Sequence, residues 1–482
     1  MTGTWKLKGE RKLEILFAVF VLGIWVFWAY ILPFNEGPDE HMRSLIVKYI
    51  VEYGKLPTGY QQEILDPLWG FTYGFRPILP QMAEALLVRI ALVFTRDAFA
   101  LLFAGRMASV LCGLVYLIYV RGISRRLFER RSLAWLFTLA AVCMPGVSFL
   151  FTYLNCDSMA LMAAAMILYY LIRGTEDGFS IPVCVKLAVS LSVCVLSYYN
   201  AYGFLITSVL VFAGVFWERR RQGETCGAEF WKKGFLILGI VLLLAGWWFV
   251  RNYILYDGDF LGLRTQDLCA EQYAADRLKP SNRQTYRNLG LSLWDMLVHS
   301  NWVYCVAQSF IGVLGPLWYM LNKWVYIGYG AFFLAGWAQS AVELLGWLGK
   351  IFRKEAGTDR ARLLWHLGML TAVLVPNVLN FWYSYATDYQ AQGRYSMPML
   401  LPFLYYTVQG LGNFISMAER KWGEKAHRAA GLAVRCLCGA ICAVLLGCLT
   451  HVMWPAYKNV ENKMDGVVYT EEEIRDRLNG VI

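Results

Sequence analysis

Long apolar stretches separated by short polar ones dominate the chain. The first runs from about Leu13 to Leu32, which is long enough to cross roughly 30 Å of hydrocarbon as a helix. Pro33 and Pro38 end it. The pattern predicts an all-α polytopic membrane protein with about 11 transmembrane helices. The other ten stretches lie at about 99–120, 132–151, 157–173, 181–198, 201–217, 234–252, 322–346, 363–383, 397–417 and 431–453.

The composition agrees with a membrane protein. Of 482 residues, 58% are hydrophobic, 16% are aromatic and only 17% are charged. The first apolar stretch is too long for a cleaved signal peptide, and no small-residue cleavage site follows it, so we expect a retained helix. No polar stretch is long enough for a separate soluble domain. We therefore expect one membrane domain over residues 1–453, with outer loops at 33–98 and 253–322, and a short extracytoplasmic tail at 454–482.

Basic residues gather in five clusters between the apolar stretches. Such clusters are typical of cytoplasmic loops, so we place the N-terminus in the cytoplasm of a multi-pass protein of the cell membrane. The segment at about 77–94 is also apolar, but counting it as a crossing would move one cluster outside. We therefore expect a juxtamembrane or re-entrant helix there. Clusters that alternate with spans share no single face, which argues against a nucleic-acid partner. The clusters are Lys6–Lys12, Arg121–Arg131, Arg219–Lys233, Lys350–Arg362 and Arg420–Arg428.

With this topology the polar motifs all face the outside. The segment Asn35–Met42 places three carboxylates and an imidazole directly after the first span. Charge at a membrane boundary is either solvated or functional. Three arginines on the same side, Arg76, Arg251 and Arg394, break the positive-inside bias. Each alone fits a local interfacial pairing, but together, beside acidic motifs, they suggest an anion site that faces carboxylates.

The cysteines offer little chemistry. Most lie inside apolar stretches, where cysteine behaves as a small hydrophobic residue. No Cys-x-x-Cys or histidine-rich spacing predicts zinc. Cys269 and Cys305 fall in one predicted outer loop, and whether they form a disulfide stays open, because sequence alone does not set the geometry.

Five short motifs carry a resemblance to known proteins. Pro-Asp-Glu-x-x-Arg after the first span, with a long first outer loop, resembles the GT-C superfamily of integral-membrane glycosyltransferases. Protein O-mannosyltransferases and lipid A aminoarabinose transferases belong to it. More closely, the chain resembles bacterial polytopic proteins of domain-of-unknown-function family 2142. One departure is His41, which follows Glu40 directly, whereas the family's histidine typically stands two residues further on. The motifs are Gly37-Pro38-Asp39-Glu40-His41, Asn155-Cys156-Asp157-Ser158, Trp248–Asp259, Gln308–Gly312 and Gln392–Pro398.

The resemblance implies a GT-C-like bundle with juxtamembrane helices in the first outer loop, and a glycosyltransferase activity. The donor would be a polyprenyl-phosphate-linked sugar. The acceptor would be an envelope glycan, a lipid-linked glycan or a protein at the outer face of the membrane, with inversion at the sugar carbon. Such a transfer needs a carboxylate base for the acceptor proton. It also needs positive charge on the departing phosphate, for which the arginine fork is suited.

The resemblance also assigns roles to individual residues. Asp39 aligns with the general base, Glu40 is its companion, and Asp157 matches a second acidic position. Asp39 and Asp157 together could hold a divalent cation, Mg²⁺ or Mn²⁺, through oxygen ligands. The candidates for the donor phosphate are Arg76, with Arg251 and Arg394 as alternative or additional contacts. The candidates for acceptor or sugar contacts are His41, Asn155, Gln392 and Tyr395.

Three other functions remain open at this point. A lipid-linked glycan flippase or transporter would also have many spans, but such proteins often carry internal repeats and charges in mid-span. Here no repeat is visible, and the acidic residues gather in outer loops. A glycan polymerase or ligase would share the donor, although Asp39-Glu40 after the first span favours the transferase. A non-catalytic subunit of a cell-envelope polysaccharide assembly system is the third alternative.

Overall fold

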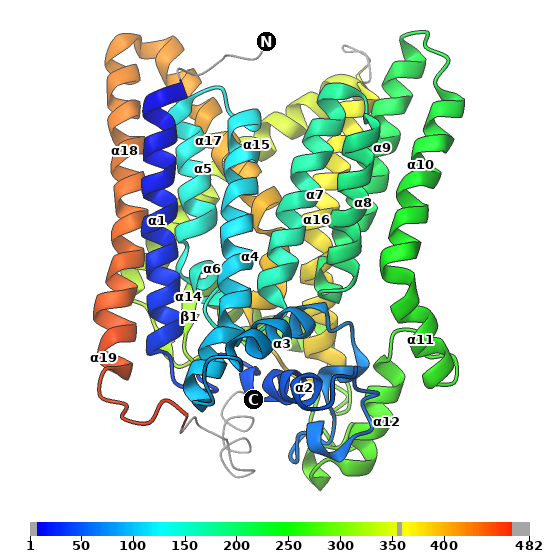
Figure 1. Cartoon of the computed structure of the whole chain (residues 1–482). Coiled ribbons are helices and arrows are strands. Elements are labelled where there is room, and N and C mark those ends of the chain that lie inside the picture. Colours follow the sequence, from blue (N-terminus) through cyan, green and yellow to red (C-terminus); the bar gives the residue numbers. More distant parts are fainter. Residues whose placement is uncertain (1–6, 354–358, 465–482) are drawn as a thin grey trace.

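In this computed structural model, residues 7–353 and 359–464 are described, and most of them are helical (Figure 1). The first half contains α1 (Leu7–Ile31), α2 (Glu40–Tyr53), η1 (Gln62–Ile64), η2 (Tyr73–Phe75), α3 (Leu79–Ala91), α4 (Ala98–Leu127), α5 (Arg131–Cys143), α6 (Pro145–Leu150), α7 (Asp157–Asp177), α8 (Ile181–Val195), η3 (Tyr199–Tyr202) and α9 (Gly203–Arg221). The second half contains α10 (Gly227–Val241), η4 (Leu242–Gly246), α11 (Trp247–Leu255), α12 (Leu263–Tyr273), η5 (Asp276–Leu278), α13 (Leu293–His299), α14 (Trp302–Gly312), β1 (Val313–Leu314), β2 (Tyr319–Met320), α15 (Lys323–Phe352), α16 (Arg360–Ala386), η6 (Gly393–Met399), α17 (Leu400–Trp422), α18 (Glu424–Gly447), η7 (Cys448–Met453) and α19 (Trp454–Tyr457).

The predicted spans coincide with helices. Among the described residues, eight helices are long and apolar enough to cross a membrane. These account for eight of the eleven predicted stretches, and the remaining three correspond to α5 with α6, to α8 and to α17. The apolar segment at 77–94 forms α3, which lies with α2 across one end of the bundle and not along it (Figure 1). The all-α polytopic fold with juxtamembrane helices is therefore confirmed.

One predicted span is interrupted. The stretch at 132–151 was predicted as a single helix, but α5 ends at Cys143 and α6 begins at Pro145. Met144 between them has extended backbone angles, φ −60° and ψ 128°. Proline disfavours the helical region for the residue before it and has no N–H to donate. The break follows from Pro145, and the prediction of one continuous helix rested on the apolar pattern without taking this proline into account.

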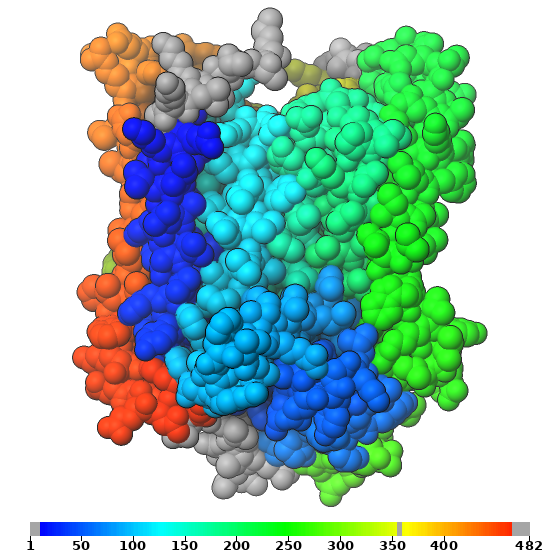
Figure 2. Space-filling view, viewed as in Figure 1, coloured from blue at the N-terminus to red at the C-terminus, as the bar shows by residue number. Residues whose placement is uncertain are grey.

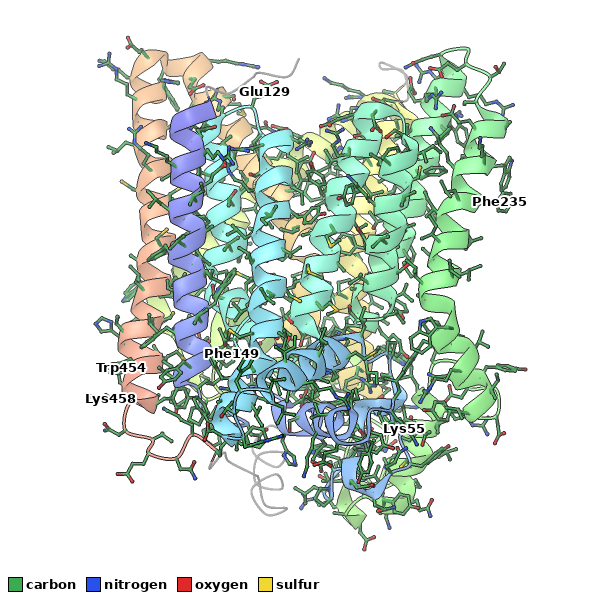
Figure 3. The ribbon with its side chains drawn as sticks, in the orientation of Figure 1. Lys55, Glu129, Phe149, Phe235, Trp454 and Lys458 are labelled. Carbon is green, nitrogen blue, oxygen red and sulfur yellow. The ribbon has the colours of Figure 1, made fainter. Side chains whose placement is uncertain are left out.

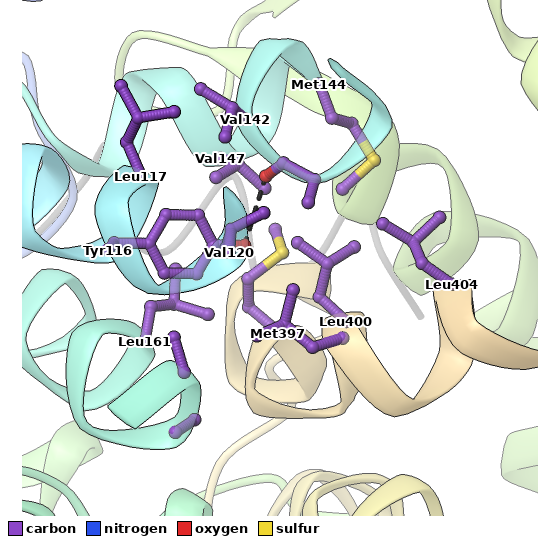
Figure 4. Close-up of a cluster of buried hydrophobic side chains, with 14 of the residues drawn as sticks. Tyr116, Leu117, Val120, Val142, Met144, Val147, Leu161, Met397, Leu400 and Leu404 are labelled. Atoms are coloured by element: carbon purple, nitrogen blue, oxygen red, sulfur yellow. Dashed lines mark hydrogen bonds between the residues drawn. The ribbon is translucent and has the colours of Figure 1, made fainter. Parts of the chain in front are cut away.

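Apolar side chains cover both the inside and the outside of the bundle. In the core, Tyr116 of α4 lies among residues of α6, α7 and η6, and its hydroxyl donates to the Ala141 carbonyl oxygen at 3.1 Å (Figure 4). On the outside, Leu16 is 66% exposed, and Phe235 projects away from the bundle along α10 (Figure 3). Helices that are apolar all round are expected where lipid replaces water. Figure 2 shows that α1 is exposed along its length on one side of the bundle.

Close contact between backbones holds the second half of the bundle together. Helices α15 and α17 meet at Gly336 and Gly410, where a Cβ atom on Gly410 would lie 1.9 Å from the Gly336 carbonyl oxygen. Small residues at such crossings let helices approach and gain dispersion energy, which matters in lipid because no hydrophobic force drives helices together there.

The two ends of the bundle differ in chemistry. Ion pairs of Arg131 with Glu10 at 2.6 Å and of Arg121 with Glu14 at 2.7 Å join the start of α1 to the basic clusters of α4 and α5. Figure 3 shows Glu129 at this end and Lys55 at the opposite end, where α2 and α3 lie. The described basic clusters thus gather away from the polar motifs, as the predicted topology requires.

Two smaller predictions also meet the structure. All twelve cysteines lie in the described part of the chain and are free thiols, so Cys269 and Cys305 are not bridged. At the C-terminal end, the last span continues four residues into the predicted tail as α19. The rest of that tail, residues 465–482, lies outside the described residues.

Candidate active site

The turn after α1 presents Asp39 in an unusual backbone conformation. Asn35 and Asp39 have φ angles of 61° and 63°, in the left-handed region that most side chains avoid. Asp39 precedes the first residue of α2, yet its side chain makes no capping hydrogen bond to that helix. Its Oδ2 atom instead accepts from Nη2 of Arg394 at 2.5 Å. Sparsely populated backbone angles gather at functional sites, where surrounding contacts enforce them.

Arg394 is oriented by its own motif. Its Nε donates to Gln392 Oε1 at 2.6 Å, and its Nη2 donates to the Tyr395 hydroxyl at 2.9 Å. The guanidinium also lies 4.7 Å from the Tyr395 ring centroid. Gly393 lets this segment approach α14, because a Cβ atom there would lie 2.0 Å from the backbone nitrogen of Phe310. The Gln-Gly-Arg-Tyr motif therefore holds one arginine against Asp39.

Two further arginines flank a single tyrosine ring close to Asp39. The guanidinium of Arg43 lies 4.6 Å from the Tyr73 centroid, and that of Arg76 lies 5.3 Å from it. Arg76 donates through Nε to Gln266 at 2.7 Å. In residues 7–353 and 359–464, no carboxylate forms an ion pair with either guanidinium. Both line one small gap together with Tyr198. Two cations without a carboxylate partner thus lie side by side.

Glu84 does not neutralise this pair. It lies buried in α3, and both of its carboxyl oxygens lack a hydrogen-bond partner among the described residues. Burial raises its pKa to about 8, although the charge of Arg43 opposes the shift. Glu84 is therefore largely protonated near neutral pH, and the positive charge of Arg43 remains available to another anion.

Asp39 keeps its negative charge. Burial by itself would raise its pKa, but the charges of Arg394, Arg43 and Arg76 outweigh that effect and hold the pKa below its ordinary value. Asp157, at the start of α7, is only 3% exposed and lies in the field of the same Arg394 and Arg43. Its Oδ1 has no hydrogen-bond partner within the part of the chain that the structure describes. The structure thus brings together Asp39, Asp157 and two of the three predicted arginines.

Glu40, predicted as the companion of Asp39, has a different place. It is fully buried and forms a two-pronged ion pair with Arg106 of α4, with N–O distances of 2.7 and 2.8 Å. Arg106 also donates to the carbonyl oxygens of Ala29, Leu32 and Pro33, which the end of α1 leaves unpaired. Glu40 therefore fixes the turn that carries Asp39 and cannot reach a substrate.

Three other candidates also serve the scaffold. Asn155 is fully buried and caps the start of α7 by accepting from the Ser158 N–H at 2.8 Å, so it is not open to a sugar. Arg251 donates to the Pro57 carbonyl oxygen and lies 4.7 Å from the Trp248 centroid, away from the Arg43–Arg76 gap. His41 packs its ring against Phe34 at 5.9 Å between centroids. The structure thus places Asn155 and Arg251 outside the lining of both the cavity beside Asp39 and the Arg43–Arg76 gap, and the roles predicted for them stay predictions.

An open cavity of about 450 Å³ adjoins Asp39. Asp39, Gln392 and Arg394 line it on one side. The outer loop 253–322 also contributes Arg283, and the loop between α16 and η6 contributes Asp388, four residues before Gln392. A carboxylate that stays ionised therefore faces a space large enough for a sugar-sized group, within the electrostatic reach of Arg43 and Arg76.

The predicted divalent cation does not fit this arrangement. Among the described residues, no group of three histidine, cysteine, aspartate or glutamate side chains is placed to hold a metal ion. Asp39 and Asp157 would have to supply the ligands, but Arg394 already occupies one Asp39 oxygen at 2.5 Å. Guanidinium groups already supply the positive charge that a metal ion would bring.

Some site residues were missed by the sequence interpretation. Arg43 stands in the Pro-Asp-Glu-x-x-Arg motif but was given no role, although its spacing from Asp39 predicts the same helix face. Arg106 is a lone arginine inside an apolar stretch, and such a charge signals a buried partner. Arg283 carries no local signal, because only the folded outer loop brings it to the cavity, whereas Asp388 stands in the polar outer segment that ends in the Gln-Gly-Arg-Tyr motif.

Comparison with known proteins identifies the fold. No protein-family model matches the sequence, and no curated protein sequence matches it. Among solved structures, ArnT from Cupriavidus metallidurans bound to undecaprenyl phosphate is similar over 88% of this chain and 63% of that chain, with 15% identity and a TM-score of 0.51. ArnT in the apo state is similar over 91% of this chain and 66% of that chain, with 14% identity and a TM-score of 0.50. Archaeal oligosaccharyltransferase AglB from Archaeoglobus fulgidus, in complex with an inhibitory peptide and a dolichol-phosphate, is similar over 94% of this chain and 57% of that chain. Its identity is 11% and its TM-score is 0.47.

The chain is a polytopic helical membrane protein with a GT-C-like fold, the fold of ArnT. That expectation from the motifs is confirmed. The chain spans between 63% and 66% of the length of the two ArnT chains. Membership of family 2142 stays a prediction, since no family model matches.

Proposed function

We propose that this protein is a membrane glycosyltransferase that moves a sugar from a polyprenyl-phosphate donor to an acceptor hydroxyl. One observation carries the proposal: an ionised carboxylate, Asp39, faces an open cavity beside Arg43 and Arg76, two arginines that form no ion pair with a carboxylate among the described residues. The fold supports a lipid-phosphate donor, because ArnT, which shares it, was solved bound to undecaprenyl phosphate.

The reaction follows from these positions. Asp39 takes the proton of the acceptor hydroxyl while that oxygen attacks the anomeric carbon of the donor sugar. The bond between that carbon and the phosphate oxygen breaks, polyprenyl phosphate leaves, and the configuration inverts. Arg43 and Arg76 bind the phosphate and stabilise the negative charge that grows on it during transfer.

Arg394 receives a positioning role in this proposal. It was one of three arginines predicted for the phosphate, but its ion pair with Asp39 already compensates its charge. Gln392 and Tyr395 were predicted to contact sugar, and their hydrogen bonds to Arg394 assign them to its orientation as well. All three act on Asp39, which touches the acceptor.

Binding of the donor phosphate should change the pKa of Asp39. The cations that lower the pKa of Asp39 include Arg43 and Arg76, the same groups that bind the donor phosphate. A bound phosphate brings negative charge close to Asp39, which favours its protonated form and raises its pKa. Asp39 thus becomes a stronger base only when donor is present.

This coupling predicts a pH signature. The acid limb of kcat, which reports the donor-bound enzyme, should lie at higher pH than the acid limb of kcat/KM for the donor, which reports the free enzyme. Steady-state rates measured between about pH 4 and pH 8 check the order of the two limbs. Limbs at the same pH, or in the reverse order, contradict the coupling.

The site faces the outside of the cell in this proposal. The basic clusters lie at the opposite end of the bundle, and such clusters are retained in the cytoplasm. The acceptor is then an envelope glycan, a lipid-linked glycan or a protein. The test incubates the purified protein in lipid nanodiscs with a panel of labelled undecaprenyl-phosphate sugars and an envelope extract. Label transferred with release of undecaprenyl phosphate supports the proposal, whereas label that stays on the lipid throughout supports a flippase or an assembly subunit.

A further inference from the structure

We propose that the cavity beside Asp39 binds an acceptor that carries an anionic group, a phosphate or a carboxylate, and that Arg283 recognises this group. The inference rests on the proposed function and deepens it by naming the chemical class of the acceptor. Arg283 is separate from the arginines that face the donor, because it comes from the outer loop 253–322 and lines the 450 Å³ cavity, whereas Arg43 and Arg76 line the small gap.

Arg283 is a buried cation with unused hydrogen-bonding capacity. Its side chain is only 8% exposed. Nε donates to the Leu278 carbonyl oxygen at 2.7 Å, and the guanidinium lies 5.5 Å from the Trp69 ring centroid. Its Nη2 has no hydrogen-bond partner, and no carboxylate forms an ion pair with it, in the part of the chain that the structure describes. A buried charge without a partner is costly unless a ligand completes it.

The cavity favours an anion near Arg283. Three arginines and two aspartates line it, and one of those aspartates, Asp39, is already paired with Arg394. The other, Asp388, accepts a hydrogen bond from Gln390 at 2.6 Å. Burial raises the pKa of Asp388, against the opposing effects of Gln390 and Arg283, so it opposes a bound anion less than an exposed aspartate would.

The same cavity places both ends of such an acceptor. With its anionic group on Arg283, the acceptor extends through the cavity toward Asp39, which takes the proton of its hydroxyl. The new bond joins that oxygen to the donor sugar, and the leaving group is polyprenyl phosphate at Arg43 and Arg76. Donor and acceptor anions then lie on different arginines, so each site can be tested alone.

Three probes that share the same methyl glycoside ring and differ at carbon 6 test the inference: methyl glucoside, methyl glucoside 6-phosphate and methyl glucuronide. Their dissociation constants are measured by saturation-transfer NMR on the protein in nanodiscs. At least one anionic probe should bind about tenfold or more tightly than the neutral probe, since a hydrogen bond to a charged group is worth that much. Tighter binding of the phosphate or of the glucuronide names which anion the acceptor carries.

The variant Arg283→Gln should bring the anionic probes to the affinity of the neutral one, and Arg283→Lys, which keeps the charge, should restore part of the preference. The matched control Arg287→Gln removes an exposed arginine four residues away and should change nothing. Equal affinities of all three probes for the wild-type protein, or an unchanged preference in folded Arg283→Gln, would overturn the inference. Binding of undecaprenyl phosphate in the same nanodiscs reports the donor site separately, so failure of the proposed function would show there instead.

Discussion

We expect Asp39→Asn to slow sugar transfer by about 10²–10⁴-fold, the contribution typical of a general base. Asparagine keeps the shape of the side chain and can still accept the hydrogen bond from Arg394, but it cannot take up the acceptor proton. The variant also removes a negative charge near the donor phosphate, so undecaprenyl phosphate should bind at least as tightly as it does to the wild type. Initial rates and lipid binding, measured on the same preparation, separate these two effects.

A matched control for this variant is Asp276→Asn. Asp276 belongs to the other outer loop, 253–322, is 91% exposed and forms an ion pair with Lys279, so its loss should leave transfer unchanged. Wild-type transfer rates in Asp39→Asn would remove Asp39 as the base and direct attention to Asp157, the other carboxylate in the field of Arg43 and Arg394.

The second large effect concerns the donor. Arg43→Ala or Arg76→Ala should weaken binding of undecaprenyl phosphate by roughly 2–5 kcal/mol, the cost of losing one partner of a desolvated charge pair. That corresponds to about 30-fold to several-thousand-fold in Kd. Lysine at either position keeps the charge but not the two-pronged geometry, so Arg76→Lys should bind with intermediate affinity. Titration of labelled undecaprenyl phosphate into nanodiscs measures each Kd.

Two arginine variants serve as controls for the donor site. Arg264 is exposed on the same end of the molecule, and Arg251 is committed to Pro57 and Trp248, so alanine at either position should leave the Kd near that of the wild type. If Arg43→Ala and Arg76→Ala also bind undecaprenyl phosphate with wild-type affinity, the donor phosphate lies elsewhere. That result would favour the alternative of a non-catalytic assembly subunit.

Much of the fold could be predicted from the sequence because membrane helices obey a strong local rule. Every backbone polar group must be satisfied in lipid, so a long apolar stretch is a helix. The rule does not give the break at Met144, which depends on one proline, or the pairing of stretches. The contact of Glu40 with Arg106 joins residues 66 positions apart, and that of Asp39 with Arg394 joins residues 355 apart. Neither ion pair can be predicted from the spacing of apolar and polar residues.

The sequence motifs predicted which segments form the candidate site, but they did not predict the role of each residue in it. Asp39 and Glu40 are neighbours in one motif, and only the structure separates them: the first faces a cavity and the second is sealed against Arg106. Asn155 and Asp157 are also close in one motif but differ in their contacts. Asn155 caps α7, whereas Asp157 lies close to the charges of Arg394 and Arg43. Burial and partners decide the role, and both arise from tertiary packing. Arg283 illustrates the limit, since it belongs to none of the five motifs.

In the proposed reaction a lipid-linked phosphate lies between Arg43 and Arg76, beside the ionised Asp39. A cryo-electron microscopy structure of the protein in nanodiscs loaded with undecaprenyl phosphate tests it most directly. We expect phosphate density within hydrogen-bonding distance of both guanidinium groups, with the Asp39–Arg394 ion pair intact. Phosphate bound away from both arginines at saturating lipid, or a gap that stays closed around Tyr73, would contradict it.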